Sequence, residues 1–413
     1  MRPPRQWFAC ICVGAGTMGG GIAMAPGQRR DPGNVDRNES GGHRPWPQGH
    51  RKELFSRRVE GAAHTGQMDT RMGLIKPSIA LDDAAEVDIV IEAVFERMDI
   101  KQEIFRKLDA IARRGAILAT NTSTLDVDAI AQVTKRPQDV IGTHFFSPAN
   151  VMRLLEVVRC AKTAQDVLAT VMKLGKTIGK VPIVSGVCDG FIGNRMLEKY
   201  LQQAMFLLDD GATPAQVDNA LEGWGLKMGP FAMYDMAGND IFWEIRKRQY
   251  RERPDMVYSR LGDRICEQGW FGQKTGRGWY RYEAGNRKPI PDPEVGALIA
   301  EYRKEIGVAP RAVSDQEIVE RCVYALVNEA AFILEEGIAL RASDIDVVYL
   351  TGYGFPPWRG GPMFYASHVG LTQVVDAIKR FQESYQGDQW KLAPLLGSLA
   401  AQVETFTDYD LKK

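Results

Sequence analysis

A hydroxyl, an imidazole and a carboxylate follow one another along the middle of this chain, each beside a short apolar run. Ser123 comes shortly after the run 116–119, His144 follows the run 140–142, and Glu156 lies within the run 154–158. Ligands bind at the carboxyl ends of the strands in an open parallel sheet, so neighbouring strands would bring these side chains together. An imidazole can accept a proton near neutral pH, and a carboxylate can orient it. The pattern predicts a proton-transfer site.

Glycines with a characteristic spacing follow the apolar stretch 7–13. Gly14, Gly16 and Gly19 form GxGxxG, in which the first glycine permits a tight turn and the second lets a pyrophosphate approach the backbone. The third glycine allows close packing of helix on strand, and the amides of that helix point at the phosphates. The motif predicts a dinucleotide-binding turn.

Strand and helix patterns alternate up to about residue 185, which indicates a Rossmann-type parallel sheet with helices on both faces. The expected strands are 87–94, 115–119, 140–142, 154–158 and 181–185, and the expected helices are 99–113 and 163–178. Helical patterns follow, with a long helix over 194–210. AMFLLDDG (204–211) recurs as AAFILEEG (330–337), and 217–235 is echoed by 345–365. The fold class expected is therefore an α/β sheet domain followed by two all-α subdomains related by an internal repeat.

These patterns set the expected domain boundaries. The dinucleotide-binding Rossmann-like domain spans 1–185, the first helical copy 186–285, a linker 286–313, and the second helical copy 314–413.

Residues 26–67 depart from this plan. They are rich in Pro, Gly and Arg and show no strand period, although Asp36 and Glu39 stand at about the distance at which a ribose-binding acid is expected. A disordered insertion, a basic binding arm and a stretch read in a shifted frame are the three explanations. The segment begins and ends abruptly, and its composition differs from that of the rest of the chain, so a shifted reading frame is favoured. His43, His50 and His64 have no metal-ligand spacing, so no metal site is expected.

Composition excludes some classes of function. The 413 residues carry zero net charge, which gives no global attraction to nucleic acid or an anionic membrane. No run approaches the roughly 18 apolar residues of a membrane span. The six cysteines are scattered, which is typical of reduced thiols in a cytosolic protein, and the C-terminal DYDLKK matches no peroxisomal signal. We therefore expect a cytoplasmic protein.

Seven motifs together resemble one known family. GAGTMGGG, VIEAVFE, TNTSTL, THFFSPANVMRLLEVV, CDGFIGNRM, KTGRGWY and GYGFPPWRGGP are similar to L-3-hydroxyacyl-CoA dehydrogenases, and HFFSP is most similar to the dehydrogenase part of the bifunctional enoyl-CoA hydratase/dehydrogenases. The resemblance covers 68–413 and roughly 11–25. It implies NAD-dependent oxidation of an L-3-hydroxyacyl-CoA to a 3-ketoacyl-CoA in fatty acid β-oxidation. No hydratase segment precedes the glycine turn, so hydratase chemistry is not expected from these residues.

The resemblance also implies roles for individual residues. His144 would take the proton of the 3-hydroxyl, Glu156 would orient His144, and Ser123 and Asn194 would hydrogen-bond the developing carbonyl or the thioester oxygen. The residues implied in the NAD site are Gly14, Gly16, Met18, Gly19, Glu96 and Lys101. Ser147 stands where many relatives have Asn, so a contact assigned to that Asn does not transfer.

Less specific interpretations stay open for several of these features. Ser123 could cap a helix beginning near Asp126, and Lys101 read alone is more typical of a solvated helix residue. The apolar helix faces fit a homodimer or packing between domains. Because of 26–67, the main alternative function is a catalytically silent acyl-CoA-binding or scaffold protein with an impaired NAD site. A dehydrogenase acting on a free hydroxy acid fits the helical repeat poorly.

Overall fold

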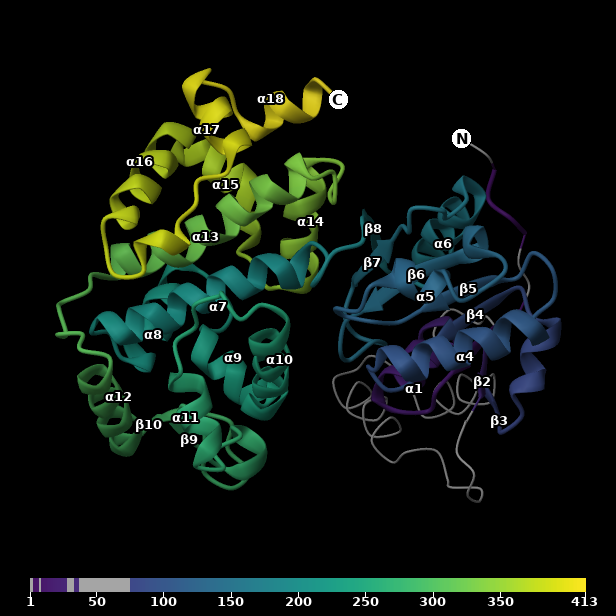
Figure 1. The fold of residues 1–413 in the computed structure, drawn as a ribbon, viewed down its shortest axis with the longest axis horizontal. Coiled ribbons are helices and arrows are strands. Elements are labelled where there is room, and N and C mark those ends of the chain that lie inside the picture. The colour runs from purple at the N-terminus through teal and green to yellow at the C-terminus, as the bar shows by residue number, and fades with distance from the viewer. Residues whose placement is uncertain (1–2, 7–8, 28–32, 37–74) are drawn as a thin grey trace. The chain divides into compact units, whose positions relative to one another are not determined.

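The computed structural model describes residues 3–6, 9–27, 33–36 and 75–413. The chain forms two compact units (Figure 1). Unit 1 comprises Met1–Asn194 with Glu336–Leu340, and unit 2 comprises Arg195–Glu335 with Arg341–Lys413. In the described part of the chain, no helix is both long and apolar enough to span a membrane.

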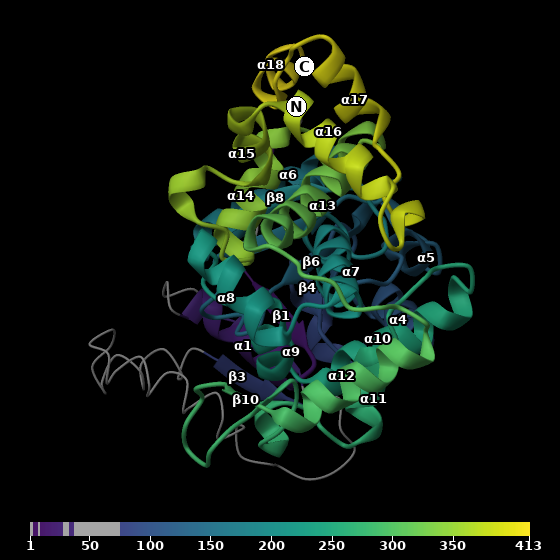
Figure 2. The ribbon, with the colours of Figure 1, turned by 90° about the vertical axis from the view of Figure 1, so that its left-hand side faces the viewer.

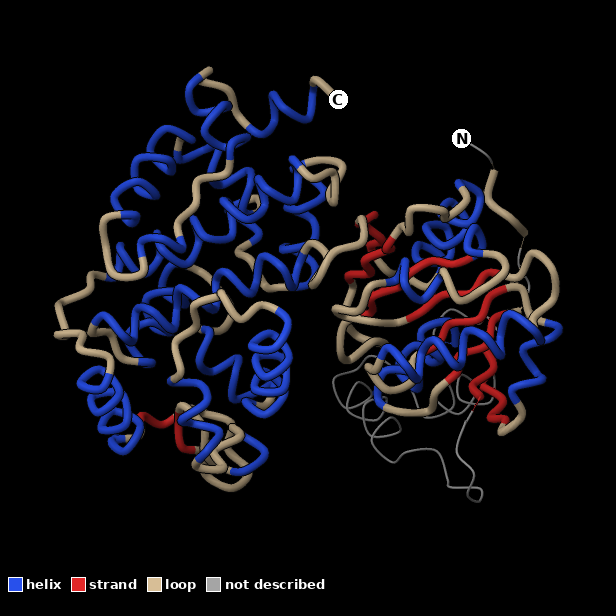
Figure 3. Tube along the Cα trace, in the orientation of Figure 1, coloured by secondary structure: helices blue, strands red, loops and turns tan. Residues whose placement is uncertain are grey.

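Unit 1 is built on a sheet whose strands are drawn in red in Figure 3. The sheet has eight strands in the order β3-β2-β1-β4-β5-β6-β7-β8. The strands are β1 (Cys10–Val13), β2 (Gly33–Asp36), β3 (Ile75–Ser78), β4 (Ile89–Glu92), β5 (Ile117–Thr120), β6 (Val140–Phe145), β7 (Leu154–Val158) and β8 (Val181–Ser185). Every neighbouring pair is parallel except β6 and β7, which are antiparallel. The expected parallel sheet is confirmed apart from that pair. The connection 146–153 is too short for a crossover between parallel strands, which needs a dozen or more residues.

The sheet contains two strands, β2 and β3, that the sequence did not predict. β2 pairs parallel with β1 and places Asp36 opposite Val13. The absence of a strand in this region was therefore a wrong expectation for residues 33–36. Most of the segment 26–67, with Glu39, His43, His50 and His64, lies outside the described residues.

Helices cover both faces of the sheet because successive strand side chains point to opposite sides. Cys10 and Cys12 of β1 join the core on one face, and Ile11 and Val13 join the core on the other. The first core packs under α1 (Thr17–Gly27) and α6 (Gln165–Thr177), and the second under α4 (Met98–Ile111) and α5 (Val127–Ala131). The short helices η1 (Leu81–Glu86) and η2 (Pro137–Asp139) complete the described helices of this unit.

Unit 2 is predominantly helical. It is entered through α7 (Gly193–Asp210), the long helix expected over 194–210. The first half then contains α8 (Pro214–Trp224), α9 (Pro230–Ala237), α10 (Asn239–Glu252), α11 (Leu261–Glu267), η3 (Gln273–Thr275), β9 (Tyr280–Arg281), β10 (Ile290–Pro291) and α12 (Pro293–Glu305). The second half contains α13 (Asp315–Glu335), α14 (Ala342–Gly352), η4 (Pro357–Arg359), α15 (Pro362–Val369), α16 (Leu371–Gln382), η5 (Gly387–Gln389), α17 (Pro394–Ala401) and α18 (Phe406–Leu411). Helix α13 packs against α15, α16 and α17 (Figure 2).

The two helical copies share a detailed hydrogen-bond arrangement. In the first copy the carboxylate of Asp218 accepts the backbone amides of Phe231 and Ala232, both at 2.9 Å, at the start of α9. In the second copy the carboxylate of Asp346 accepts the amides that begin α15, with Met363 at 2.7 Å. The internal repeat is therefore confirmed in three dimensions. The bounds of the four expected segments stay predictions, and the expected linker 286–313 contains α12.

Candidate active site

The structure brings the predicted imidazole and carboxylate into direct contact. The antiparallel register of β6 and β7 sets His144 opposite Glu156, and residues that face each other in this way share one side of the sheet. His144 Nδ1 lies 2.7 Å from Glu156 Oε2. Glu156 is fully buried and His144 is 5% exposed, so the pair lies in a nearly water-free environment.

The second oxygen of Glu156 is held by backbone amides. Oε1 accepts hydrogen bonds from the amides of Ile192 at 3.1 Å and Gly193 at 3.0 Å, where α7 begins. Amides at a helix N-terminus favour a negative charge. A carboxylate can only accept hydrogen bonds, so Nδ1 of His144 carries the hydrogen and Nε2 is left as the acceptor. Sequence reasoning missed these amides, although GFIGN directly before a long helix was a signal for them.

Ser123 lies at the carboxyl end of β5 and binds Glu96. Glu96 Oε1 accepts hydrogen bonds from Thr122 Oγ1 at 2.6 Å, Ser123 N at 2.7 Å and Ser123 Oγ at 3.2 Å. Burial acts to raise the pKa of Glu96, but the charge of Lys101 and these hydrogen bonds outweigh burial and lower that pKa. The capping interpretation of Ser123 is wrong, because Asp126 caps α5 through the amide of Ala129 at 3.1 Å.

Lys101 is fully buried, so its interpretation as a solvated helix residue is wrong. Its ammonium group donates to Glu92 Oε1 at 2.8 Å and to the carbonyl of Asn121 at 2.8 Å. Glu92 also accepts from Thr120 Oγ1 at 2.6 Å. These bonds tie the carboxyl ends of β4 and β5 to α4. The sequence carried a signal for this ion pair that was missed, namely an acid at the end of the apolar strand VDIVIE with a lysine nine residues later.

The glycine turn has the geometry that a dinucleotide requires. Gly14 has a φ of +115°, and a Cβ there would lie 2.5 Å from the carbonyl oxygen of Ala93. A Cβ on Gly19 would overlap the backbone of Gly14. At Gly16 a Cβ would meet nothing within 4 Å, so the backbone there is open to an approaching pyrophosphate. Met18 is half-buried against the core beneath α1. The residues present therefore fit NAD.

Asn194, the remaining predicted site residue, is the second residue of α7. It is half-buried and follows Gly193, whose amide binds Glu156. This places Asn194 beside the carboxylate's backbone donors, while its role toward a substrate stays a prediction.

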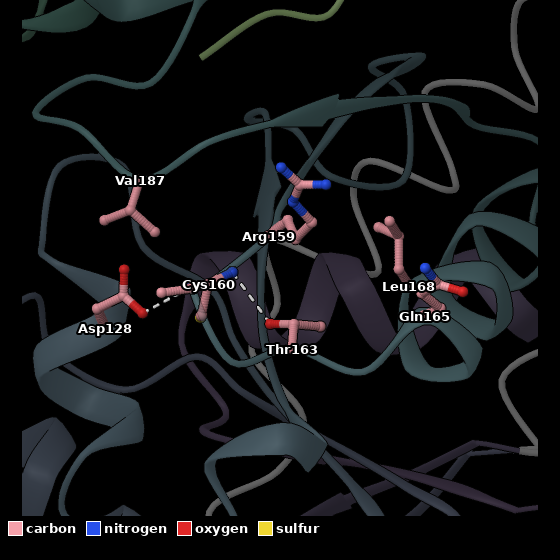
Figure 4. A pocket seen from close by; sticks show the side chains of 8 residues that line it. Asp128, Arg159, Cys160, Thr163, Gln165, Leu168 and Val187 are labelled. Atoms are coloured by element: carbon pink, nitrogen blue, oxygen red, sulfur yellow. Dashed lines mark hydrogen bonds between the residues drawn. The ribbon is translucent and has the colours of Figure 1, made fainter. Parts of the chain in front are cut away.

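A pocket of about 400 Å³ lies elsewhere in unit 1 (Figure 4). It is lined by Asp128, Arg159, Cys160, Ala161, Thr163, Gln165, Leu168 and Val187. Thr163 Oγ1 donates to the carbonyl of Val140 at 2.7 Å, which places the pocket near the amino end of β6. His144 is near the carboxyl end of that strand, and no predicted site residue lines the pocket.

A glycine turn after β1 and a histidine–glutamate pair near the same edge of the sheet define an NAD-dependent dehydrogenase. The chain belongs to the 3-hydroxyacyl-CoA dehydrogenase family, because residues 9–188 match the family's NAD-binding domain and residues 190–282 and 318–405 match its C-terminal domain.

Named relatives and solved structures agree with this membership. The chain is 45% identical to the peroxisomal bifunctional enzyme of Danio rerio over 412 residues, which are 96% of this chain and 57% of that relative. The fold is similar to 3-hydroxybutyryl-CoA dehydrogenase from Escherichia coli, with a TM-score of 0.84, 23% identity, and coverage of 98% of this chain and 100% of that one. The dehydrogenase part of multifunctional enzyme 1 from C. elegans gives a TM-score of 0.70 at 26% identity, covering 96% and 90% of the two chains.

The expected cytoplasmic location is wrong. The matched relatives include enzymes named peroxisomal, as in Danio rerio, and glyoxysomal, as in Brassica napus. Scattered cysteines indicate the redox state of the surroundings, whereas a compartment is set by short signals that receptors read. Composition was therefore the wrong evidence for location.

Proposed function

We propose that this chain oxidises an L-3-hydroxyacyl-CoA to the 3-ketoacyl-CoA with NAD as the acceptor. The observation that carries the proposal is the 2.7 Å contact between His144 Nδ1 and the buried carboxylate of Glu156. A buried pair of this kind leaves Nε2 able to take a proton from a secondary alcohol, and losing that proton allows the alcohol to give up hydride.

Each residue of the site has its own role in the proposed reaction. His144 Nε2 removes the proton of the 3-hydroxyl, and Glu156 holds the tautomer and stabilises the imidazolium that forms. Ser123 and Asn194 hydrogen-bond the developing carbonyl or the thioester oxygen, which positions the substrate. When bound, NAD would supply the acceptor for the hydride that leaves C3 of the substrate.

The cofactor site is proposed along the same edge of the sheet. The open backbone at Gly16, with Gly14, Met18 and Gly19 around it, would hold the pyrophosphate at the start of α1. Glu96 and Lys101 would line the nicotinamide half, since Glu96 binds Ser123 and Lys101 binds the backbone at the end of β5.

The physiological setting is also a proposal, because the chain spans only about half the length of its curated relatives. Their names favour fatty acid β-oxidation in peroxisomes. Assembly as a homodimer stays a prediction from the apolar helix faces.

Formation of NADH tests the proposal. We expect absorbance of NADH to rise when the protein is mixed with NAD and L-3-hydroxybutyryl-CoA. The D-enantiomer and free 3-hydroxybutyrate serve as controls, and neither should react. If the L-thioester binds without turnover and NAD gives no thermal shift, the silent acyl-CoA-binding alternative replaces this proposal.

A further inference from the structure

Phe191 holds a backbone conformation that L-amino acids rarely adopt. Its φ is +51°, and Gly190 before it has a φ of +76°. A bulky side chain in this left-handed region is unfavourable, so the conformation persists only where surrounding structure holds it. The side chain of Phe191 is fully buried and belongs to the core that includes Val127 and Val158. Core packing therefore secures the turn.

The turn ends at the two amides that bind the predicted active-site carboxylate. Ile192 and Gly193 directly follow Phe191, and both donate to Glu156 Oε1. The ring of Phe191 also lies against the imidazole, with 5.8 Å between the ring centres, while Phe146 lies 4.2 Å from the imidazole. One buried side chain thus contacts the base and fixes the backbone that holds the base's partner.

We propose that Phe191 is a positioning residue for hydride transfer: its buried ring locks the left-handed turn whose next two amides orient Glu156, and through Glu156 the imidazole of His144. The inference rests on the dehydrogenase function proposed above. Nothing in it requires Phe191 to touch the substrate or NAD.

Graded loss of the ring tests this role. Phe191→Leu keeps an apolar anchor, and Phe191→Ala removes most of it. A small misplacement of reacting groups can lower a rate by up to a hundredfold, so we expect kcat to fall about threefold to tenfold in the leucine variant and tenfold to a hundredfold in the alanine variant. The KM for NAD should not change. A substrate deuterated at C3 should show a larger isotope effect on kcat, because hydride transfer becomes slower relative to product release.

Phe105 provides the matched control. It is fully buried in the same core, on α4, and has no ring contact with His144. Phe105→Leu and Phe105→Ala should lower the melting temperature as much as the Phe191 variants do, while kcat and the isotope effect stay at the wild-type values.

Two outcomes would count against these ideas, and they are separable. If the wild type is active and Phe191→Ala keeps its kcat while losing stability as Phe105→Ala does, Phe191 is only a core residue and the inference fails. If the wild type itself forms no NADH, the proposed function fails, and the role of Phe191 in hydride transfer fails with it.

Discussion

In the proposed mechanism, His144 acts as a base only while one ring nitrogen donates a hydrogen bond and the other can accept a proton. Glu156 occupies Nδ1, and the amides of Ile192 and Gly193 occupy the other carboxylate oxygen. The imidazole is thus restrained by Glu156, and Glu156 by the two amides. These hydrogen bonds lower the reorganisation of the site that is needed when the imidazolium forms.

Replacing the base tests this arrangement. We expect His144→Gln to lower kcat by about a hundredfold to ten-thousandfold, the usual contribution of a general base, because an amide cannot take the hydroxyl proton. Acyl-CoA affinity, measured by calorimetry, should stay close to wild type, since the polar side chain still fills the site. Retained turnover would remove His144 from the mechanism.

The buried ion pair of Lys101 makes a different prediction, about stability. Lys101→Met leaves Glu92 buried without its cation, and breaking a buried pair in this way costs about 3–5 kcal/mol of unfolding free energy. The control is on the same helix, where exposed Lys107 pairs with Glu103 at 2.7 Å. Lys107→Met should leave the free energy of unfolding close to the wild-type value, because water screens an exposed ion pair. Urea unfolding of the wild type and the two variants measures both changes in unfolding free energy. Equal losses in the two variants would contradict the assignment of Lys101 to a stabilising buried ion pair.

At the scale of the elements, two variants of the glycine turn should distinguish an effect on cofactor binding from an effect on the stability of the fold. Gly16→Ala adds a Cβ into open space, so we expect unfolding free energy within about 0.5 kcal/mol of wild type. The same methyl group would stand where the pyrophosphate approaches, so NADH affinity should fall at least tenfold. Gly14→Ala should destabilise the fold itself, because its φ is +115° and the new Cβ meets the carbonyl of Ala93. NADH fluorescence titration and thermal unfolding report the two effects, and a Gly16→Ala variant that binds NADH normally would place the pyrophosphate elsewhere.

Local sequence patterns predicted most elements of unit 1 because apolar runs mark buried strands. Residues 154–158 and 181–185 became β7 and β8 with the expected bounds. Their direction was not predicted, since an apolar run looks the same in parallel and antiparallel strands, and only the short connection 146–153 indicated the reversal. β2 was missed because Gly33–Asp36 has no apolar period.

For the candidate site, the sequence predicted the side chains but not the backbone groups that bind them. His144 and Glu156 were predicted as a pair from residue type and placement. The amides of Ile192 and Gly193 were not, because their contact with Glu156 depends on the turn at Phe191, thirty-five residues away from that carboxylate in sequence.

Across unit 2, the repeat in the sequence corresponds to a repeat in the hydrogen bonding. The segments 217–235 and 345–365 differ in most residues, yet Asp218 and Asp346 bind the first amides of α9 and α15 in the same way. Repeated motifs thus predicted the duplication. They did not predict the buried aspartates at the end of α7, whose surroundings depend on Ser259 and on Arg321 of α13.

Two adjacent aspartates at that end of α7 lie in opposite environments. Asp209 is fully buried; its Oδ1 accepts from Ser259 at 2.9 Å, and no donor among the described residues reaches its Oδ2. Burial raises the pKa of Asp209 to about 7. Asp210 instead forms an ion pair with the buried guanidinium of Arg321 and lies 3.2 Å from Arg311.

These environments predict opposite effects on the stability of unit 2. A carboxyl whose pKa is raised by folding contributes stability at low pH that is lost as pH rises through its folded pKa, here near 7. Asp209→Asn removes that loss, which begins above the unfolded pKa of 3.8, so its gain over wild type should be roughly 1–3 kcal/mol larger at pH 8 than at pH 5. Asp210→Asn removes the nearer counter-ion of Arg321, while Glu317 stays at 3.6 Å, and should cost up to about 3 kcal/mol at both pH values. Urea unfolding of both variants at the two pH values measures the difference, and destabilisation by Asp209→Asn at pH 8 would mean that its charge is stabilised by Arg303 or Arg321 more than burial opposes it.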